Sequence, residues 1–114
     1  MRSMRYLGIV YHNQGRYEEA EPLYLQCLEG RRVKLGADHP DTLMSMNNLA
    51  NLYSDQGRYE EAEPLYLQCL EGRRVKLGAD HPDTLRSTIC LAALYSDQGR
   101  YDEAEPLYLQ CLEG

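Results

Sequence analysis

A 42-residue repeat is the feature that most constrains what this chain can fold into. Residues 14–43 recur unchanged at 56–85, and residues 56–72 recur at 98–114 with one substitution, Glu60 to Asp102. The 114 residues therefore divide into units of approximately 2–43, 44–85 and 86–114, the last of which is truncated. Units of this length bury their apolar faces only by stacking on one another, so the sequence predicts an elongated array.

Each unit contains two stretches with the apolar spacing of an amphipathic helix. The first stretch of the middle unit follows the segment ADHPD, where Asp38 or His39 can cap a helix and Pro40 suits the first turn. We expect this helix to end before Gly57, which supplies a left-handed turn. Its apolar face consists of Leu43, Met46, Leu49, Ala50 and Tyr53.

The second helical stretch follows after a very short loop, so the two helices of a unit are expected to be antiparallel neighbours. Pro64 and Gly72 both disfavour a helix interior, yet each recurs in every unit. We expect the helix to continue to Gly78, and a stop at Gly72 is the alternative. Its apolar face consists of Tyr59, Ala62, Tyr66, Cys69 and Leu70. The two patterns together predict an all-α chain.

Composition excludes several classes of protein. The net charge is −6 and Lys and Arg form no large cluster, which argues against nucleic-acid binding. No apolar run is long enough to span a membrane, and the N-terminal segment has no signal-peptide pattern. Cys27, Cys69 and Cys111 occupy one repeat position and form no CxxC pair, so we expect packed thiols in a reducing, cytoplasmic compartment, without a metal or other cofactor.

The repeated residues resemble the tetratricopeptide repeat (TPR) family. The signature is Leu49, Ala50, Tyr53, Gly57, Tyr59, Ala62, Tyr66 and Leu70, and equivalent residues occur in the other two units. The 42-residue period, with LGADHPDTL, NNLANLY and EEAEPLY, is similar to the long-repeat branch seen in kinesin light chains. The resemblance implies a TPR solenoid, which is a right-handed α-α superhelix, here of three helical hairpins.

The family resemblance also implies a peptide-binding groove on the concave side, lined by the first helix of each unit. Five of the six differences between 44–72 and 86–114 lie in that helix, although drift on an exposed surface is an alternative explanation. Asparagine side chains suit the backbone of an extended peptide, and arginine grips carboxylates, which favours an acidic peptide. The candidate groove residues are Arg2, Arg5, His12, Asn47, Asn48, Asn51 and Arg86.

The remaining polar motifs have structural interpretations. We expect the lone His12 to be solvated, the EEAE segments to complement the helix dipole, and the RRVK segments to place cations late in a helix. A clamp for a C-terminal carboxylate is not expected, because Ile9 and Cys90 replace the polar residues that it needs. No group of residues suggests catalysis, so we expect a binding protein rather than an enzyme.

A second hypothesis is structural. The last helix presents Tyr108, Cys111 and Leu112 much as the internal copies present their counterparts to the next unit. Copies of the chain can therefore stack head to tail or exchange hairpins, forming homo-oligomers. A fragment of a longer repeat array or an engineered repeat protein would behave in this way.

Overall fold

The structure is a computed structural model that describes residues 2–113, with side chains described from 6 to 112. Within that range the chain is helical and contains no strand, as the repeat pattern predicts. None of the helices within it is long and apolar enough to cross a membrane. The helices are α1 (Arg2–Asn13), α2 (Tyr17–Leu35), α3 (Pro40–Asp55), α4 (Tyr59–Leu77), α5 (Pro82–Asp97) and α6 (Tyr101–Glu113).

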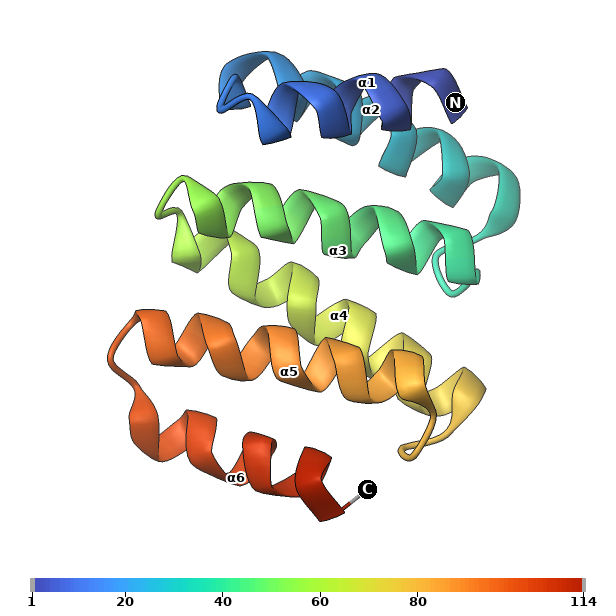
Figure 1. Ribbon diagram of the computed structural model, residues 1–114. Helices are drawn as coiled ribbons and strands as arrows, with labels where there is room; N and C mark the ends of the chain where they lie inside the picture. The colour runs from blue at the N-terminus through green and yellow to red at the C-terminus, as the bar shows by residue number, and fades with distance from the viewer. Residues whose placement is uncertain (1, 114) are drawn as a thin grey trace.

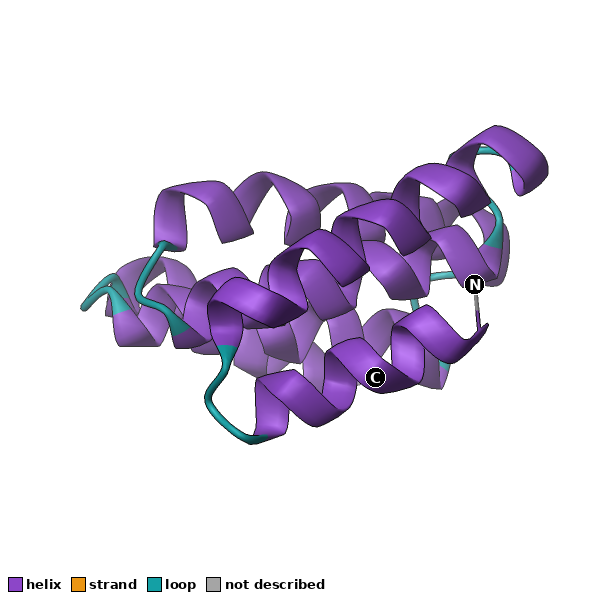
Figure 2. Ribbon diagram, turned by 90° about the horizontal axis from the view of Figure 1, so that it is seen from above, coloured by secondary structure: helices purple, strands orange, loops and turns teal. Residues whose placement is uncertain are grey.

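The helices form three hairpins that stack into a superhelix. Each helix packs chiefly against the helix before it and the helix after it. Figure 1 shows α1, α3 and α5 one above another, with α1 and α6 at opposite ends of the stack. Seen from above in Figure 2, the loops gather at the ends of the helices and leave their long faces uninterrupted. The first helices of the three units therefore share one side of the molecule.

Both predicted ends of the first helix are confirmed. The His39 ring accepts a hydrogen bond from the backbone N–H of Asp41 through Nδ1 at 3.1 Å, and His81 does the same for Asp83. Gly57 follows the helix with a φ of +77°, a left-handed conformation that costs glycine little. The repeated histidines are therefore helix caps.

The second helix runs through its internal glycine, as expected. Helix α4 continues to Leu77, and Gly78 follows it as the C-cap residue. A Cβ atom built on Gly72 would lie 2.8 Å from Cδ2 of Leu43, so the glycine permits the close approach of α3 and α4. The packing of Leu43 thus explains a residue that helix propensity alone disfavours.

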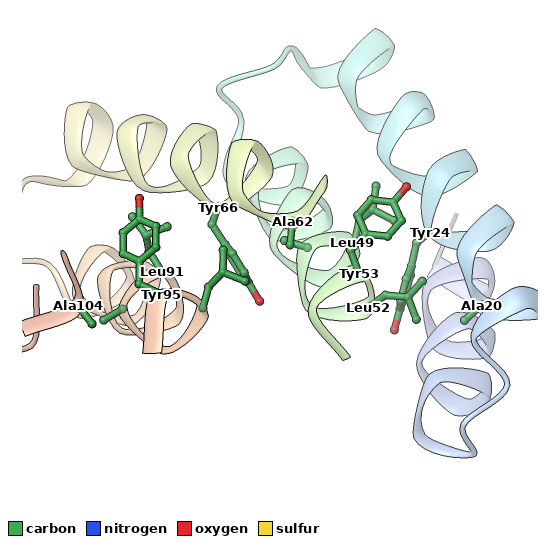
Figure 3. Close-up of a cluster of buried hydrophobic side chains, with 13 residues drawn as sticks. Ala20, Tyr24, Leu49, Leu52, Tyr53, Ala62, Tyr66, Leu91, Tyr95 and Ala104 are labelled. Atoms are coloured by element: carbon green, nitrogen blue, oxygen red, sulfur yellow. The ribbon is translucent and has the colours of Figure 1, made fainter. Parts of the chain in front are cut away.

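One continuous apolar cluster holds the hairpins together. It extends from α2 to α6, as the labelled side chains in Figure 3 show. Ala20 and Ala62 are fully buried, and their small side chains allow the two helices of a hairpin to lie close together. The larger members include Tyr24, Leu49, Leu52, Tyr66, Leu91 and Leu94.

A buried arginine joins each hairpin to the next. Nη1 of Arg31 donates to the carbonyl oxygen of Asp41 at 3.0 Å and to Oγ of Ser45 at 2.9 Å. Arg73 makes the equivalent bonds one repeat later. The interpretation of RRVK as cations that favour the helix end was therefore wrong for its first arginine, which is nine-tenths buried and satisfies polar groups of the following helix.

A second connection between units involves the last glutamate of EEAE. Oε1 of Glu21 accepts from Nη1 of Arg58 at 2.8 Å, and the Arg58 guanidinium lies 4.3 Å from the ring centroid of Tyr53. Glu63 and Arg100 repeat this ion pair at 2.9 Å. The prediction that EEAE only complements the helix dipole is therefore incomplete, because its third glutamate links neighbouring hairpins.

Candidate functional site

A polar pocket of about 390 Å³ spans the first helices of all three hairpins. Successive turns of α3 contribute Asn51 and Ser54, which are three residues apart and share one face. Tyr66 reaches the pocket from α4. The other lining residues are His12 and Asn13 of α1, Asp55 of α3, and Cys90, Ala93, Leu94 and Asp97 of α5. We call this space the groove pocket.

The three predicted asparagines lie near one another on α3. Asn51 lines the groove pocket, and its Oδ1 accepts a short hydrogen bond from the Tyr66 hydroxyl. Asn47 is one turn earlier on the same face, and its Oδ1 is buried without a hydrogen-bond partner among the described residues. Asn48 is half-buried beside it. Asn47 therefore carries a buried acceptor that the described residues leave unsatisfied.

The predicted arginines are farther from the groove pocket. Arg86 is exposed near the start of α5, on the helical face that also carries Cys90, Ala93 and Asp97. Eleven residues of helix place Arg86 about 16 Å along the axis from Asp97. The side chains of Arg2 and Arg5 lie outside the described residues.

His12 is not solvated, so that prediction was wrong. Its Nδ1 lies 3.2 Å from the hydroxyl of Tyr24, and its Nε2 lies 2.5 Å from Oδ2 of Asp55. The ring packs edge-on against Tyr17 and Tyr24, and 15% of the side chain is exposed. The histidine therefore joins α1 to α2 and α3.

Two carboxylates that were not among the predicted groove residues line the groove pocket. Asp55 and Asp97 are the last residues of α3 and α5, where the negative end of the helix dipole disfavours an anion. His12 compensates Asp55, whereas the Asp97 carboxylate makes no hydrogen bond or ion pair with a described residue. The groove is therefore negative at this end, and Arg86 lies toward its other end.

A comparison of the first two units contains the signal for this acidic end. His12 and Asn13 become Ser54 and Asp55 one period later, which are two of the eight differences between residues 2–13 and 44–55. The second and third units are identical at these positions, so the differences between those two units do not reveal it.

Known proteins share this repeat and this architecture. The sequence model of the tetratricopeptide repeat family matches residues 1–74 and 48–114, which together cover the chain. The chain belongs to the tetratricopeptide repeat family. Two solved structures of a putative kinesin light chain with nearly identical TPR-like repeats, from Podosopora anserina, superpose with a TM-score of 0.87 at 32% identity. Both matches cover 96% of this chain and 52% of the other.

Two further relatives extend the comparison. BtubC (BKLC) from P. vanneervenii has the same fold, with a TM-score of 0.89 at 22% identity over 96% of this chain and 43% of the other. A nucleotide-binding leucine-rich repeat (NLR)-like protein from Hyaloscypha variabilis is 54% identical over 41 residues, or 36% of this chain and 4% of the relative. This TPR chain thus spans about half the length of the solved relatives and a small part of the curated one. Tetratricopeptide repeats serve in general as protein-interaction scaffolds.

Burial suppresses the reactivity of the titratable groups in the TPR core. Desolvation, with a smaller contribution from the charge of Asp55, raises the pKa of Tyr24 to about 12. Burial also raises the pKa of Cys69, although its hydrogen bond to Ser87 and the charge of Arg73 oppose the change. A protonated, buried thiol is a poor nucleophile, so Cys69 has the packing role that its repetition predicts.

The predicted assembly residues lie on the outer face of the last TPR hairpin. Tyr108 is 38% exposed, whereas its counterpart Tyr66 is 4% exposed. Leu112 is 82% exposed, and Cys111 is half-buried, with Sγ 3.6 Å from the carbonyl oxygen of Leu85. No described residue covers this face. The equivalent faces of the first two hairpins pack against the helix that follows them.

Proposed function

We propose that this chain is a protein-interaction module, and not an enzyme, that binds an extended acidic peptide along the side formed by α1, α3 and α5. The observation that carries the proposal is the groove pocket, because residues from three successive first helices line one continuous space. A ligand that occupies it can contact all three hairpins together. The membership of the TPR family supports the same role.

The polar side chains in and beside the groove pocket suit a peptide backbone. An extended peptide exposes alternating N–H and C=O groups that no secondary structure satisfies. Leaving the buried Oδ1 of Asn47 unpaired costs about 1–3 kcal/mol, and a turn of this half-buried side chain would let its amide bind a peptide group instead. Arg86 is the described cation best placed to bind an acidic side chain, at the end of the groove away from Asp97.

Binding of acidic peptides should depend on both Asn47 and Arg86. We expect micromolar affinity that weakens as salt is added, because the ion pair to an exposed arginine is screened. Asn47→Ala and Arg86→Ala should each weaken binding by about tenfold, equivalent to about 1.4 kcal/mol. Isothermal titration calorimetry with a library of short acidic peptides measures both effects.

Arg74→Ala is the matched control for the loss of a positive charge. Arg74 pairs with Glu71 on the exposed face of α4 and does not line the groove pocket. This variant should bind peptides as the original chain does. Equal affinity of all the variants, or the absence of binding to any acidic peptide, contradicts the proposed function.

Self-association is a second candidate function, which the exposed ends of the stack favour. Val10 of α1 is 47% exposed, whereas its counterparts Leu52 and Leu94 are fully buried between hairpins. At the other end Leu112 is exposed, whereas Leu28 and Leu70 pack against the core. A second copy of this chain presents the complementary apolar surface to each end.

The charges at the two ends are complementary as well. Arg16 occupies the repeat position of Arg58 and Arg100, each of which binds a glutamate of the preceding hairpin. Glu105 occupies the position of those glutamates, and its carboxylate has no hydrogen bond or ion pair among the described residues. In a head-to-tail pair, Arg16 of one copy meets Glu105 of the other in the geometry already present twice within the chain.

The mass of the chain should therefore increase with concentration. Multi-angle light scattering should show an increase that Leu112→Glu suppresses, because a carboxylate would replace apolar contact at the interface. Leu109→Glu is the control, since the equivalent Leu25 and Leu67 remain exposed within the stack.

A charge exchange tests the geometry of the pair. Arg16→Glu should reduce association, and adding Glu105→Arg to it should restore association. A chain that is monomeric at the highest attainable concentration contradicts this second candidate.

A further inference from the structure

One period separates two sites that share a tyrosine and an aspartate but differ in what lies between them. In the first, an imidazole ring lies between the hydroxyl of Tyr24 and the carboxylate of Asp55. The repeat carries Tyr24 to Tyr66 and Asp55 to Asp97, whereas His12 becomes Ser54. The second site therefore keeps the two polar groups that hold the ring and replaces the ring with a small side chain.

The structure leaves the second site open. Tyr66, Ser54 and Asp97 all line the groove pocket, whose volume of about 390 Å³ is within the usual range for ligand sites. Asp97 makes no hydrogen bond or ion pair with a described residue, whereas the equivalent Asp55 binds His12. The chain thus contains both an occupied and an unoccupied version of one site.

Asn51 determines which hydrogen-bonding groups the open site accepts. The Tyr66 hydroxyl donates its proton to Oδ1 of Asn51, so the lone pairs of its oxygen remain available as acceptors. Asp97 offers a second acceptor. A ring with two N–H donors, which is an imidazolium, satisfies both.

We infer that the groove pocket binds a protonated imidazole ring, the side chain of a histidine in the peptide partner, between Tyr66 and Asp97. The ring occupies the place that His12 occupies one repeat earlier, with one N–H directed at the Tyr66 oxygen and the other at the Asp97 carboxylate. The identity of the carrier as a peptide rests on the proposed function, whereas the ring-binding site does not. The acidic end of the groove then becomes a specificity site.

Other titratable groups around the pocket are consistent with a cationic ligand. Asp55 lines the same space and adds negative charge, and one of its oxygens, Oδ2, is hydrogen-bonded to His12. Burial, with smaller contributions from Cys90, Asp55 and Asp97, raises the pKa of Tyr66, so its hydroxyl remains a neutral donor to Asn51. The Cys90 thiol is also neutral, because burial raises its pKa.

Free imidazole at slightly acidic pH is the probe that tests this inference. In two-dimensional NMR spectra of the whole chain, imidazole should shift the amides of Asn51, Tyr66 and Asp97 with roughly millimolar affinity, as expected for a ligand of five heavy atoms. 1,3-Dimethylimidazolium has the same charge but no N–H group and should cause no saturable shift. Equal shifts from the two cations would show mere charge attraction and overturn the inference.

Repeat-matched variants locate the site. Asp97→Asn should weaken the imidazole shifts strongly, because it removes the negative charge that pairs with the cationic ring. Ser54→His should abolish them, because it supplies the chain's own ring. Ser96→His is the control, because Ser96 occupies the same repeat position but does not line the groove pocket, so binding should persist. Shifts that survive both Asp97→Asn and Ser54→His overturn the inference.

The reverse substitution opens the first site. His12→Ser should lower the stability of the chain and create a second imidazole site between Tyr24 and Asp55, so that added imidazole partly restores the melting temperature. No restoration, together with no binding to the original chain, contradicts the inference. Acidic peptides that bind while imidazole does not leave the proposed function intact, and imidazole that binds while acidic peptides do not leaves the ring site intact.

Discussion

Leu52→Ala should lower the free energy of unfolding by about 3–4 kcal/mol. Leu52 has no exposed surface and belongs to the apolar cluster that runs through all three hairpins. Truncating Leu52 loses the favourable free energy of burying its side chain and leaves a cavity that neighbouring helices fill only in part. Because its counterpart Val10 is exposed where no hairpin precedes it, Leu52 packs toward the first hairpin, and the cavity weakens that interface. Urea denaturation followed by circular dichroism measures the change.

Leu67→Ala is the matched control for this prediction. Leu67 is 43% exposed on α4, so its truncation loses less buried area and leaves no closed cavity. We expect a cost of less than about 1 kcal/mol. A cost for Leu52→Ala as small as that of the control would mean that the hairpins adjust freely around the site, contrary to the close packing of the cluster.

Leu52→Ala also tests whether ligand binding depends on the stability of the core. Asn51, its neighbour in sequence, faces the groove pocket, whereas Leu52 faces the core. Imidazole and peptide affinities of Leu52→Ala, measured well below its melting temperature, should therefore match those of the original chain. Large losses of affinity would indicate that the pocket is shaped by the core as well as by its lining residues.

The helices could be predicted from sequence because their signals are local. Apolar spacing, the His39 cap and the glycine at residue 78 all act within a few residues of the structure that they determine. The repeat added a second constraint, because each signal occurs in every unit. These two facts were sufficient for the all-α hairpins, whereas a stop at Gly72 stayed an alternative until the structure showed α4 continuing to Leu77.

The connections between hairpins could not be predicted in the same way. The partners His12 and Asp55 are 43 residues apart, and Glu21 and Arg58 are 37 apart, so neither pair is encoded in a local pattern. Whether such residues meet depends on the register with which one hairpin packs on the next. Asn51 was predicted to lie in the groove because it lies on the first helix, whereas Asp97 was missed because its role depends on a neighbouring unit.

Arg73→Ala should lower the free energy of unfolding by about 2–3 kcal/mol, the second largest effect that we expect. Nη1 of Arg73 donates to the Asp83 carbonyl at 3.2 Å and to Oγ of Ser87 at 2.9 Å. The side chain is 8% exposed, so water replaces neither bond easily after truncation. Ser87 would retain only its weak contact with Sγ of Cys69 at 3.6 Å. The interface between the second and third hairpins would therefore lose the two hydrogen bonds that Arg73 makes across it.

The adjacent Arg74 supplies the control within the same RRVK segment. Its side chain is 52% exposed and pairs with Glu71 one turn away, so Arg74→Ala should change stability by no more than about 0.5 kcal/mol. Arg73→Lys should fall between the two alanine variants, because lysine keeps a charge but lacks the planar group that reaches two acceptors. Chemical denaturation of all three variants distinguishes the interpretations. Equal effects of Arg73→Ala and Arg74→Ala would mean that the arginines act only through the helix dipole, as the sequence pattern first indicated, whereas a large difference assigns Arg73 to the interface between hairpins.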